Sequence, residues 1–218
     1  MNLFYLFVLD IQNKYLRILS IIGGVSLISM SIKTEKFLKA MKVIFANEGG
    51  YVNNKCDKGG ETNLGITAAT LKTANSNKIT NITDVKQLTF DTAEDIYYQM
   101  YWIPSKSEDM NSPLDLIQFD VSINSGVKNA NKMLQKAINK AFGSNILVVD
   151  GIIGKNTMRY LSQVSDTDIK AKQLSYIYLD IRASFYEDII KRDPTQNVFR
   201  KGWMNRIQNL KNIIQKGY

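Results

Sequence analysis

The sequence predicts a mostly α protein. Apolar residues recur at helical spacing in most segments between residues 34 and 215. Only three short stretches, residues 50–53, 64–67 and 147–150, have any strand character. Of the 218 residues, 44% are apolar, which is enough to build a real hydrophobic core. We therefore expect packed helices with at most a small amount of β-structure.

The first predicted helix begins after Thr34, a residue type that often caps helix N-termini, and it ends at Glu48. Its apolar stripe consists of Phe37, Leu38, Met41, Ile44 and Phe45. A carboxylate in the last turn is unfavourable because it faces the negative end of the helix dipole. Glu48 is therefore either a surface residue before the stop signal of Gly49 and Gly50 or a residue kept for function.

Further helices follow the same periodicity. Thr89 or Asp91 is the expected cap of the third helix, and Pro104 is expected to end it. The later helices are expected at residues 67–75, 92–102, 114–124, 128–142, within 148–161, 166–192 and 196–215. Residues 105–113 form a loop that we expect to be a tight joint, so we divide the chain into residues 1–33, 34–112 and 113–218.

Residues 1–33 differ in composition from the rest. An uncharged run from Ile18 to Ile32 follows Lys14 and Arg17. It is short for a membrane helix, which needs about 20 residues, and it resembles a signal-peptide core or a weak membrane anchor. Two alternatives remain open at this point. Translation could begin at Met30, which would make the upstream residues a spurious extension, or the run could be a packed helix.

The composition excludes several kinds of active site. The chain has no histidine, so Ser-His-Asp and Cys-His nucleophile systems and histidine-ligated zinc are ruled out. A single cysteine, Cys56, cannot form an internal disulfide or a cysteine-rich metal cluster. No glycine-rich phosphate-binding loop is present. Carboxylates are the leading candidates for acid–base chemistry, and we expect no metal and no organic cofactor.

The net charge is +8, and the excess is concentrated near the end of the chain. Residues 189–218 contain seven Lys and Arg residues, with Asp193 as their single acid. Such a segment favours a polyanion, either nucleic acid or an acidic cell envelope. A solvated helix face that aids solubility is the alternative. Of these partners we favour the anionic envelope and do not expect nucleic acid.

Two carboxylates and a hydroxyl surround a glycine-rich stretch after the first helix. Asp57 follows Glu48 with eight residues between them, and Thr62 lies further on. Glycoside cleavage needs one carboxyl that donates a proton and a second that stays ionised. A helix end with apolar neighbours can raise the pKa of the donor. The residue types fit this chemistry, although the spacing by itself is not specific.

The chain resembles glycoside hydrolase family 108 over about residues 36–212. Residues 48–51 (EGGY) and 57–67 (DKGGETNLGIT) are similar to the family's EGGY…DxGGxTNxGIT signature. This family contains phage-endolysin-like N-acetylmuramidases and bacterial secretion-activator proteins. Further matching motifs occur in the expected order at residues 101–102 (YW), 119–126 (FDVSINSG), 134–135 (LQ), 150–157 (DGIIGKNT) and 199–206. The motifs from residue 134 onward are similar to a peptidoglycan-binding domain.

The resemblance implies a lysozyme-like α+β fold. In that fold a helical catalytic lobe with a Gly-rich loop or small β-hairpin packs on a helical C-terminal region. It also implies that Glu48 is the catalytic acid and that Asp57, with Thr62, stabilises the cation or holds the water. In phage lysozymes the threonine lies one residue further on. The residues expected to contact substrate are Tyr51, Asn63, Tyr101, Trp102, Asp120 and Asn124, although the YW pair could equally be core and Asn124 could cap a helix.

The expected function is N-acetylmuramidase activity on peptidoglycan. The alternatives are a lytic transglycosylase and a wall-binding or secretion-helper protein that does not need catalysis. We expect a monomer that acts on glycan strands in the periplasm or cell wall, with weak membrane association through its N-terminus as an option. If residues 1–29 are not a signal, the protein is expected in the cytoplasm before lysis.

Overall fold

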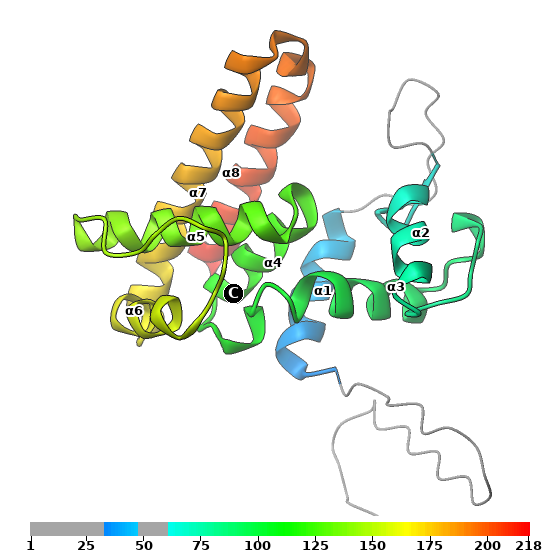
Figure 1. The fold of residues 1–218 in the computed structure, drawn as a ribbon, viewed down its shortest axis with the longest axis horizontal. Helices are drawn as coiled ribbons and strands as arrows, with labels where there is room; N and C mark the ends of the chain where they lie inside the picture. Colours follow the sequence, from blue (N-terminus) through cyan, green and yellow to red (C-terminus); the bar gives the residue numbers. More distant parts are fainter. Residues whose placement is uncertain (1–32, 48–60) are drawn as a thin grey trace, which may run out of the picture.

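The computed structural model describes residues 33–47 and 61–218. Within these residues the chain is mostly helical, with one two-stranded sheet (Figure 1). The α-helices are α1 (Glu35–Asn47), α2 (Ala68–Ser76), α3 (Phe90–Tyr97), α4 (Leu114–Ser125), α5 (Val127–Phe142), α6 (Lys155–Ser165), α7 (Asp168–Arg192) and α8 (Arg200–Lys216). The predicted mostly α architecture is confirmed. None of the helices in these two ranges has the length and apolar character needed to cross a membrane.

Helix α1 begins where the sequence predicts. The Thr34 hydroxyl accepts a hydrogen bond from the main-chain N–H of Phe37 at 3.2 Å, which satisfies one of the free donors of the first turn. Phe37 and Met41 are buried on the inner face of the helix. The Phe37 ring meets the ring of Phe119 edge to face at 5.7 Å, so α1 packs directly on α4.

A small hairpin follows the segment after α1. Its strands, β1 (Thr62–Asn63) and β2 (Ile66–Thr67), are antiparallel, with Thr62 opposite Thr67. The two turn residues, Leu64 and Gly65, have φ angles of 51° and 74°. Two consecutive left-handed residues are typical of a tight two-residue hairpin turn. Of residues 64–67, where strand character was predicted, Ile66 and Thr67 form β2, while Leu64 and Gly65 form the turn. Residues 147–150 form no strand, and residues 50–53 lie outside the described ranges.

Two predicted helices differ from the structure in detail. The third ends as an α-helix at Tyr97 and continues as a π-helical turn, η2 (Tyr98–Trp102), while Thr89 is its cap, as expected. The last predicted helix is divided into a 3₁₀ segment, η4 (Pro194–Phe199), and α8. The Asp193 side chain accepts from the main-chain N–H of Thr195 and starts η4, and Pro194 follows that cap directly. Two shorter 3₁₀ turns, η1 (Val85–Gln87) and η3 (Ser107–Asp109), connect the other helices.

Helix α4 is the central helix of the fold. All of its residues from Leu114 to Ser122 are buried. It contacts α1, η2 and η3 from the N-terminal part and α5 and α7 from the C-terminal part. The nearly uniform burial explains why its sequence is apolar on most sides. The joint predicted near residues 105–113 precedes this helix directly, and the domain boundary at residue 112 stays a prediction.

Helices α7 and α8 form a long hairpin that projects from the body of the molecule (Figure 1). The rings of Tyr186 and Trp203 stack at 4.6 Å with an interplanar angle of 14°, which holds the two helices together. Helices α5 and α6 also contact α7. The loop between α5 and α6 carries the DGIIG motif.

Candidate functional site

The predicted catalytic pair lies outside the residues that the structure describes. Glu48 and Asp57 are both in the segment 48–60, together with Tyr51 and Cys56. The elements on either side of that segment are described. Helix α1 ends at Asn47, one residue before Glu48, and the β1–β2 hairpin begins at Thr62.

Asn63 fixes the hairpin to the segment that precedes α3. Its side-chain Nδ2 donates to the main-chain carbonyl of Val85 in η1 at 2.9 Å. The Tyr97 hydroxyl on α3 donates to the carbonyl of Leu64 in the turn at 3.0 Å. The hairpin is therefore held from two directions. The Asn63 amide has a partner within the protein, and its predicted contact with substrate stays a prediction.

Thr62 carries its hydroxyl on strand β1 of the hairpin. The residue is half-buried, and its hydroxyl makes no hydrogen bond with any other residue in the described ranges. Its backbone is fixed because it pairs with Thr67 across the hairpin. A hydroxyl on a fixed strand, without a hydrogen-bond partner among the described residues, fits the predicted role of holding a water beside Asp57, a role that stays a prediction.

The predicted YW pair divides into two environments. Tyr101 is half-buried, and burial raises the pKa of its phenol, while a hydrogen bond from Thr70 acts in the opposite direction. Trp102 is fully buried, and its Nε1 donates to the Glu108 carboxylate at 2.8 Å. The indole has partners on the inside of the protein. This packing supports a structural role for Trp102, and its predicted contact with sugar stays a prediction.

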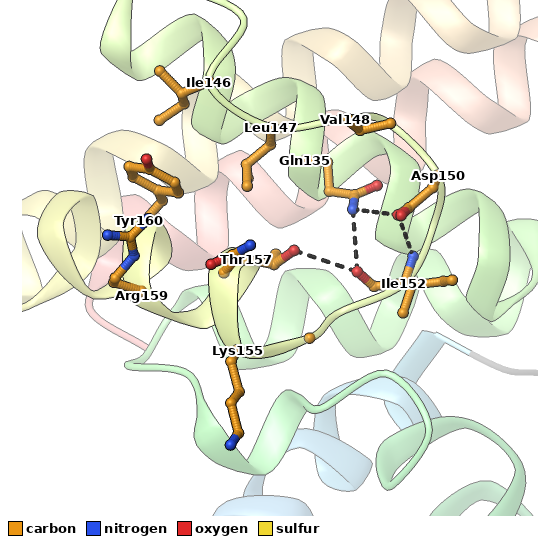
Figure 2. Close-up of a pocket in the computed structure, with 12 residues that line it drawn as sticks. Gln135, Ile146, Leu147, Val148, Asp150, Ile152, Lys155, Thr157, Arg159 and Tyr160 are labelled. Atoms are coloured by element: carbon orange, nitrogen blue, oxygen red, sulfur yellow. Dashed lines mark hydrogen bonds between the residues drawn. The ribbon is translucent and has the colours of Figure 1, made fainter.

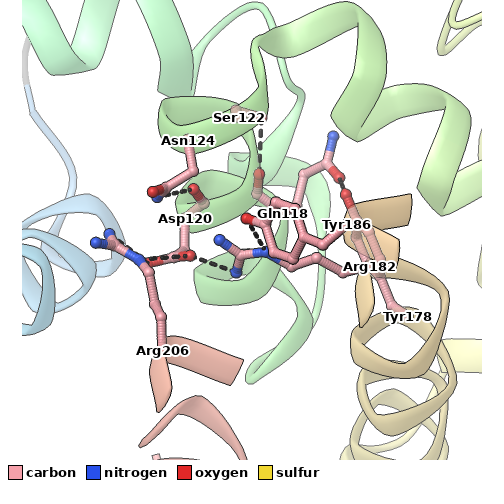
Figure 3. Close-up of polar contacts among 8 residues, drawn as sticks. All are labelled: Gln118, Asp120, Ser122, Asn124, Tyr178, Arg182, Tyr186 and Arg206. Carbon is pink, nitrogen blue, oxygen red and sulfur yellow. Dashed lines mark hydrogen bonds and ion pairs between the residues drawn. The ribbon is translucent and has the colours of Figure 1, made fainter. Parts of the chain in front are cut away.

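Asp120 is the centre of a buried ion cluster (Figure 3). Its carboxylate lies 2.6 Å from Arg182 Nη1 on α7 and 2.8 Å from Arg206 Nη2 on α8. Burial alone would raise the pKa of Asp120, but the two guanidinium groups outweigh burial and hold this pKa below its ordinary value. Asn124 is exposed, and its Nδ2 donates to the main-chain carbonyl of Asp120 one turn earlier at 2.9 Å. Both residues therefore have internal partners, and their predicted contacts with substrate stay predictions.

Further polar residues that the sequence does not predict complete this core. Gln118 Nε2 donates to Asn131 Oδ1 at 2.8 Å, and the Tyr178 hydroxyl lies 2.7 Å from Gln118 Oε1. Arg182 is fully buried on a helix whose other buried residues carry no charge. The sequence does show a basic residue at an inward-facing position of α7, which indicates a buried ion pair. Its acidic partner lies 62 positions earlier, and sequence spacing does not reveal that pairing.

A separate pocket of about 460 Å³ lies in the C-terminal region between α5, α6 and the loop that joins them (Figure 2). It is lined by residues of the LQ…DGIIGxxT motif, among them Gln135, Asp150 and Thr157. This pocket lies outside the predicted catalytic segment and the β1–β2 hairpin. The chain therefore has two separate regions with functional potential.

Comparison with known proteins supports the same division. The sequence profile described as Glycosyl hydrolase 108 matches residues 41–126, and the profile described as Predicted Peptidoglycan domain matches residues 129–208. Among solved structures, that of Brucella abortus SagA is 33% identical, with a TM-score of 0.68. The match covers 83% of this chain and 94% of that one. No curated protein sequence matches the chain. The chain therefore belongs to the glycosyl hydrolase 108 family and has a C-terminal peptidoglycan domain.

Proposed function

We propose that this peptidoglycan hydrolase is an N-acetylmuramidase that cleaves the β-1,4 bond between N-acetylmuramic acid and N-acetylglucosamine. The observation that carries the proposal is the EGGY…DxGGxTNxGIT signature, which begins directly after α1 and ends with the β1–β2 hairpin in a member of this family. The peptidoglycan domain that follows supports the same polymer as the substrate.

In the proposed mechanism Glu48 is the general acid. Its proton goes to the glycosidic oxygen as the bond to the anomeric carbon breaks, which leaves an oxocarbenium-like centre. Asp57 stays ionised and either stabilises that centre or orients the attacking water. The Thr62 hydroxyl is the second group that holds the water, which is consistent with its freedom from internal hydrogen bonds in the described chain. The water oxygen bonds to the anomeric carbon and its proton passes to a carboxylate of the Glu48–Asp57 pair, which leaves a reducing muramic acid end.

Product analysis tests this function directly. Purified peptidoglycan is digested and the fragments are weighed by mass spectrometry, with Glu48→Gln as the control protein. Hydrolysis predicts reducing muramic acid ends and a loss of about 10²–10⁴-fold in rate for Glu48→Gln, since the amide cannot donate the proton. Fragments that are one water lighter would instead identify a lytic transglycosylase. An undiminished rate in a folded Glu48→Gln protein would remove the assignment of the acid.

We also propose that the protein acts as a monomer on bacterial cell walls, in the periplasm or on the wall itself. Its net charge of +8 would favour an anionic envelope. Lysis of permeabilised cells, followed as loss of turbidity, tests whether the activity is bacteriolytic. Inactivity in this assay and on purified peptidoglycan would favour a wall-binding or secretion-helper role. Fractionation of expressing cells tests the location and whether residues 1–29 direct export.

A further inference from the structure

The pocket between α5 and α6 has opposite charges on its two sides (Figure 2). Asp150 lies on one side, where its Oδ1 accepts from Gln135 Nε2 at 2.7 Å and from the main-chain N–H of Ile152 at 2.8 Å. Its second oxygen has no hydrogen-bond partner in the described part of the chain. Arg159 lies on the opposite side, at 4.5 Å over the ring of Tyr160, and no carboxylate of a described residue forms an ion pair with it. Each charge is therefore available to a ligand.

The space between these charges is partly apolar. Leu147 forms a buried wall, while Val148 and Ile152 are 79% and 68% exposed on the rim. A ligand that fills the pocket would cover these two aliphatic side chains. The pocket volume of about 460 Å³ lies in the range of small-ligand sites.

The loop that forms the pocket is held in one conformation by buried polar groups. Gln135 Oε1 accepts from the main-chain N–H of Gly151 at 2.8 Å, and Asn139 makes two hydrogen bonds with the backbone of Leu147 at 2.8 and 2.9 Å. Gly151 has a φ of +84°, and a Cβ placed on it would lie 2.9 Å from the carbonyl oxygen of Lys128, so only glycine fits there. A loop fixed in advance loses little freedom when a ligand binds.

These features favour a peptide over a glycan. A sugar ring is commonly held on an open aromatic face, but the guanidinium of Arg159 lies over the ring of Tyr160. The stem peptide of peptidoglycan combines small methyl side chains with free carboxylates and, in its diamino acid, a free ammonium group. We propose that this pocket binds the peptide stem of peptidoglycan, with Arg159 pairing with a stem carboxylate and Asp150 with the ammonium group. This inference rests on the proposed function, because it assigns a second contact with the same polymer.

Binding of isolated fragments tests the proposal. The full chain with Glu48→Gln is titrated calorimetrically with a stem tetrapeptide that contains the diamino acid, and separately with a peptide-free N-acetylglucosamine oligomer. The tetrapeptide is expected to bind, and Arg159→Gln and Asp150→Asn are expected to weaken it about tenfold or more, because each removes one charge-assisted hydrogen bond. Asp150→Asn keeps the acceptor for Gln135 and Ile152, so the loop should be retained. Lys140→Gln, on the exposed side of α5, is the matched control and should bind as the parent does.

Activity separates this proposal from the proposed function. With Glu48 intact, Arg159→Gln should raise KM for peptidoglycan that carries stems, whereas Lys140→Gln should leave KM and kcat as in the parent. Absence of glycan cleavage by the parent chain would contradict the proposed function only. If the parent cleaves glycan but does not bind the tetrapeptide, the pocket assignment is wrong. It is also wrong if Arg159→Gln and Asp150→Asn bind the tetrapeptide as tightly as the parent does. Arg159-dependent binding of the peptide-free oligomer would overturn it too.

Discussion

The carboxylate of Asp120 on α4 lies 2.6 Å from the guanidinium of Arg182 on α7, and both side chains are almost fully buried. Arg206 on α8 contacts the same carboxylate at 2.8 Å and is 20% exposed. Three helices that are distant in the sequence therefore meet at one negative charge. This cluster joins the central helix to the projecting α7–α8 hairpin.

Removal of the shared carboxylate should destabilise the fold strongly. Asp120→Ala leaves Arg182 buried without its anion, and breaking a buried pair in this way costs about 3–5 kcal/mol. Glu187→Ala is the control, because its pair with Arg200 is exposed and should contribute less than about 1 kcal/mol. Urea unfolding followed by circular dichroism gives both free energies. Equal losses in the two variants would show that the cluster does not stabilise the helix junction.

The same cluster should make stability depend on pH in acid. Because the two guanidinium groups hold the pKa of Asp120 below its unfolded value of about 3.9, its contribution is complete above about pH 4. That contribution is lost as the pH falls through the lowered pKa. Burial raises the pKa of Asp115, so this residue changes the stability in the opposite direction as the pH falls. Because the parent and the Asp120→Asn variant both contain Asp115, its contribution cancels in the difference between them. The difference in unfolding free energy between parent and variant should therefore shrink from pH 6 to pH 3, and a constant difference would contradict this origin.

Glu108 should stabilise the junction between α1 and the end of the YW motif. Its Oε2 accepts from Trp102 Nε1 at 2.8 Å and from the Thr34 hydroxyl at 2.7 Å. Glu108→Ala leaves the buried indole N–H without an acceptor and should cost about 1–3 kcal/mol. Glu108→Gln keeps an acceptor and should recover most of the loss.

The environment of Trp102 provides a direct readout of this change. Since the chain has two tryptophans, Trp203→Phe makes Trp102 the single indole fluorophore. In that background Glu108→Ala should shift the emission of the native state, whereas KM for peptidoglycan should stay the same. A raised KM without loss of stability would point instead to a sugar contact at Trp102.

A chain that begins at Met30 should fold and retain full activity on purified peptidoglycan. It keeps Lys33, whose ammonium group pairs with Asp95 at 2.8 Å and Glu94 at 3.3 Å, and it keeps the Thr34 cap of α1. A chain that begins at Lys36 loses both and should be less stable by about 1 kcal/mol or more. Thermal unfolding and a lysis assay measure the two outcomes. Failure of the Met30 variant to fold would show that earlier residues pack into the domain.

Periodicity and capping predict the helices well because both are local. Helix α5 lies within one residue of its predicted range, and Thr34 and Thr89 cap the helices they were expected to cap. The π-helical turn η2 was missed, since it depends on how its rings pack against α1 and α4 and not on local propensity.

The functional residues were harder to place than the helices. The FDxxxNSG motif identifies Asp120 by residue type and family resemblance, but it contains no information on which way the carboxylate points. The structure directs it to Arg182 and Arg206, residues 62 and 86 positions away. Pairing over such separations is a property of helix packing. By contrast, the family resemblance implied a Gly-rich loop or small β-hairpin in the catalytic lobe, and a hairpin is present at Thr62–Thr67.

Thr62 should contribute a modest part of the catalytic rate through its hydroxyl. The side chain is half-buried on a fixed strand, and its hydroxyl has no hydrogen-bond partner among the described residues. Thr62→Val keeps the β-branched shape and removes the hydroxyl, so a water held by Asp57 would lose one of its contacts. One hydrogen bond of about 1 kcal/mol corresponds to about a fivefold fall in kcat.

Thr62→Ser retains the hydroxyl and should keep most of the rate, while Thr83→Val, on an exposed loop, is the control for the loss of a threonine hydroxyl elsewhere. The rates are measured by release of reducing ends from purified peptidoglycan, with thermal unfolding as a check that the hairpin persists. Equal rates for the parent and a stable Thr62→Val protein would leave Asp57 as the single group that orients the water. If Thr62→Ser loses as much of the rate as Thr62→Val does, the effect comes from packing of the hairpin and not from the hydroxyl.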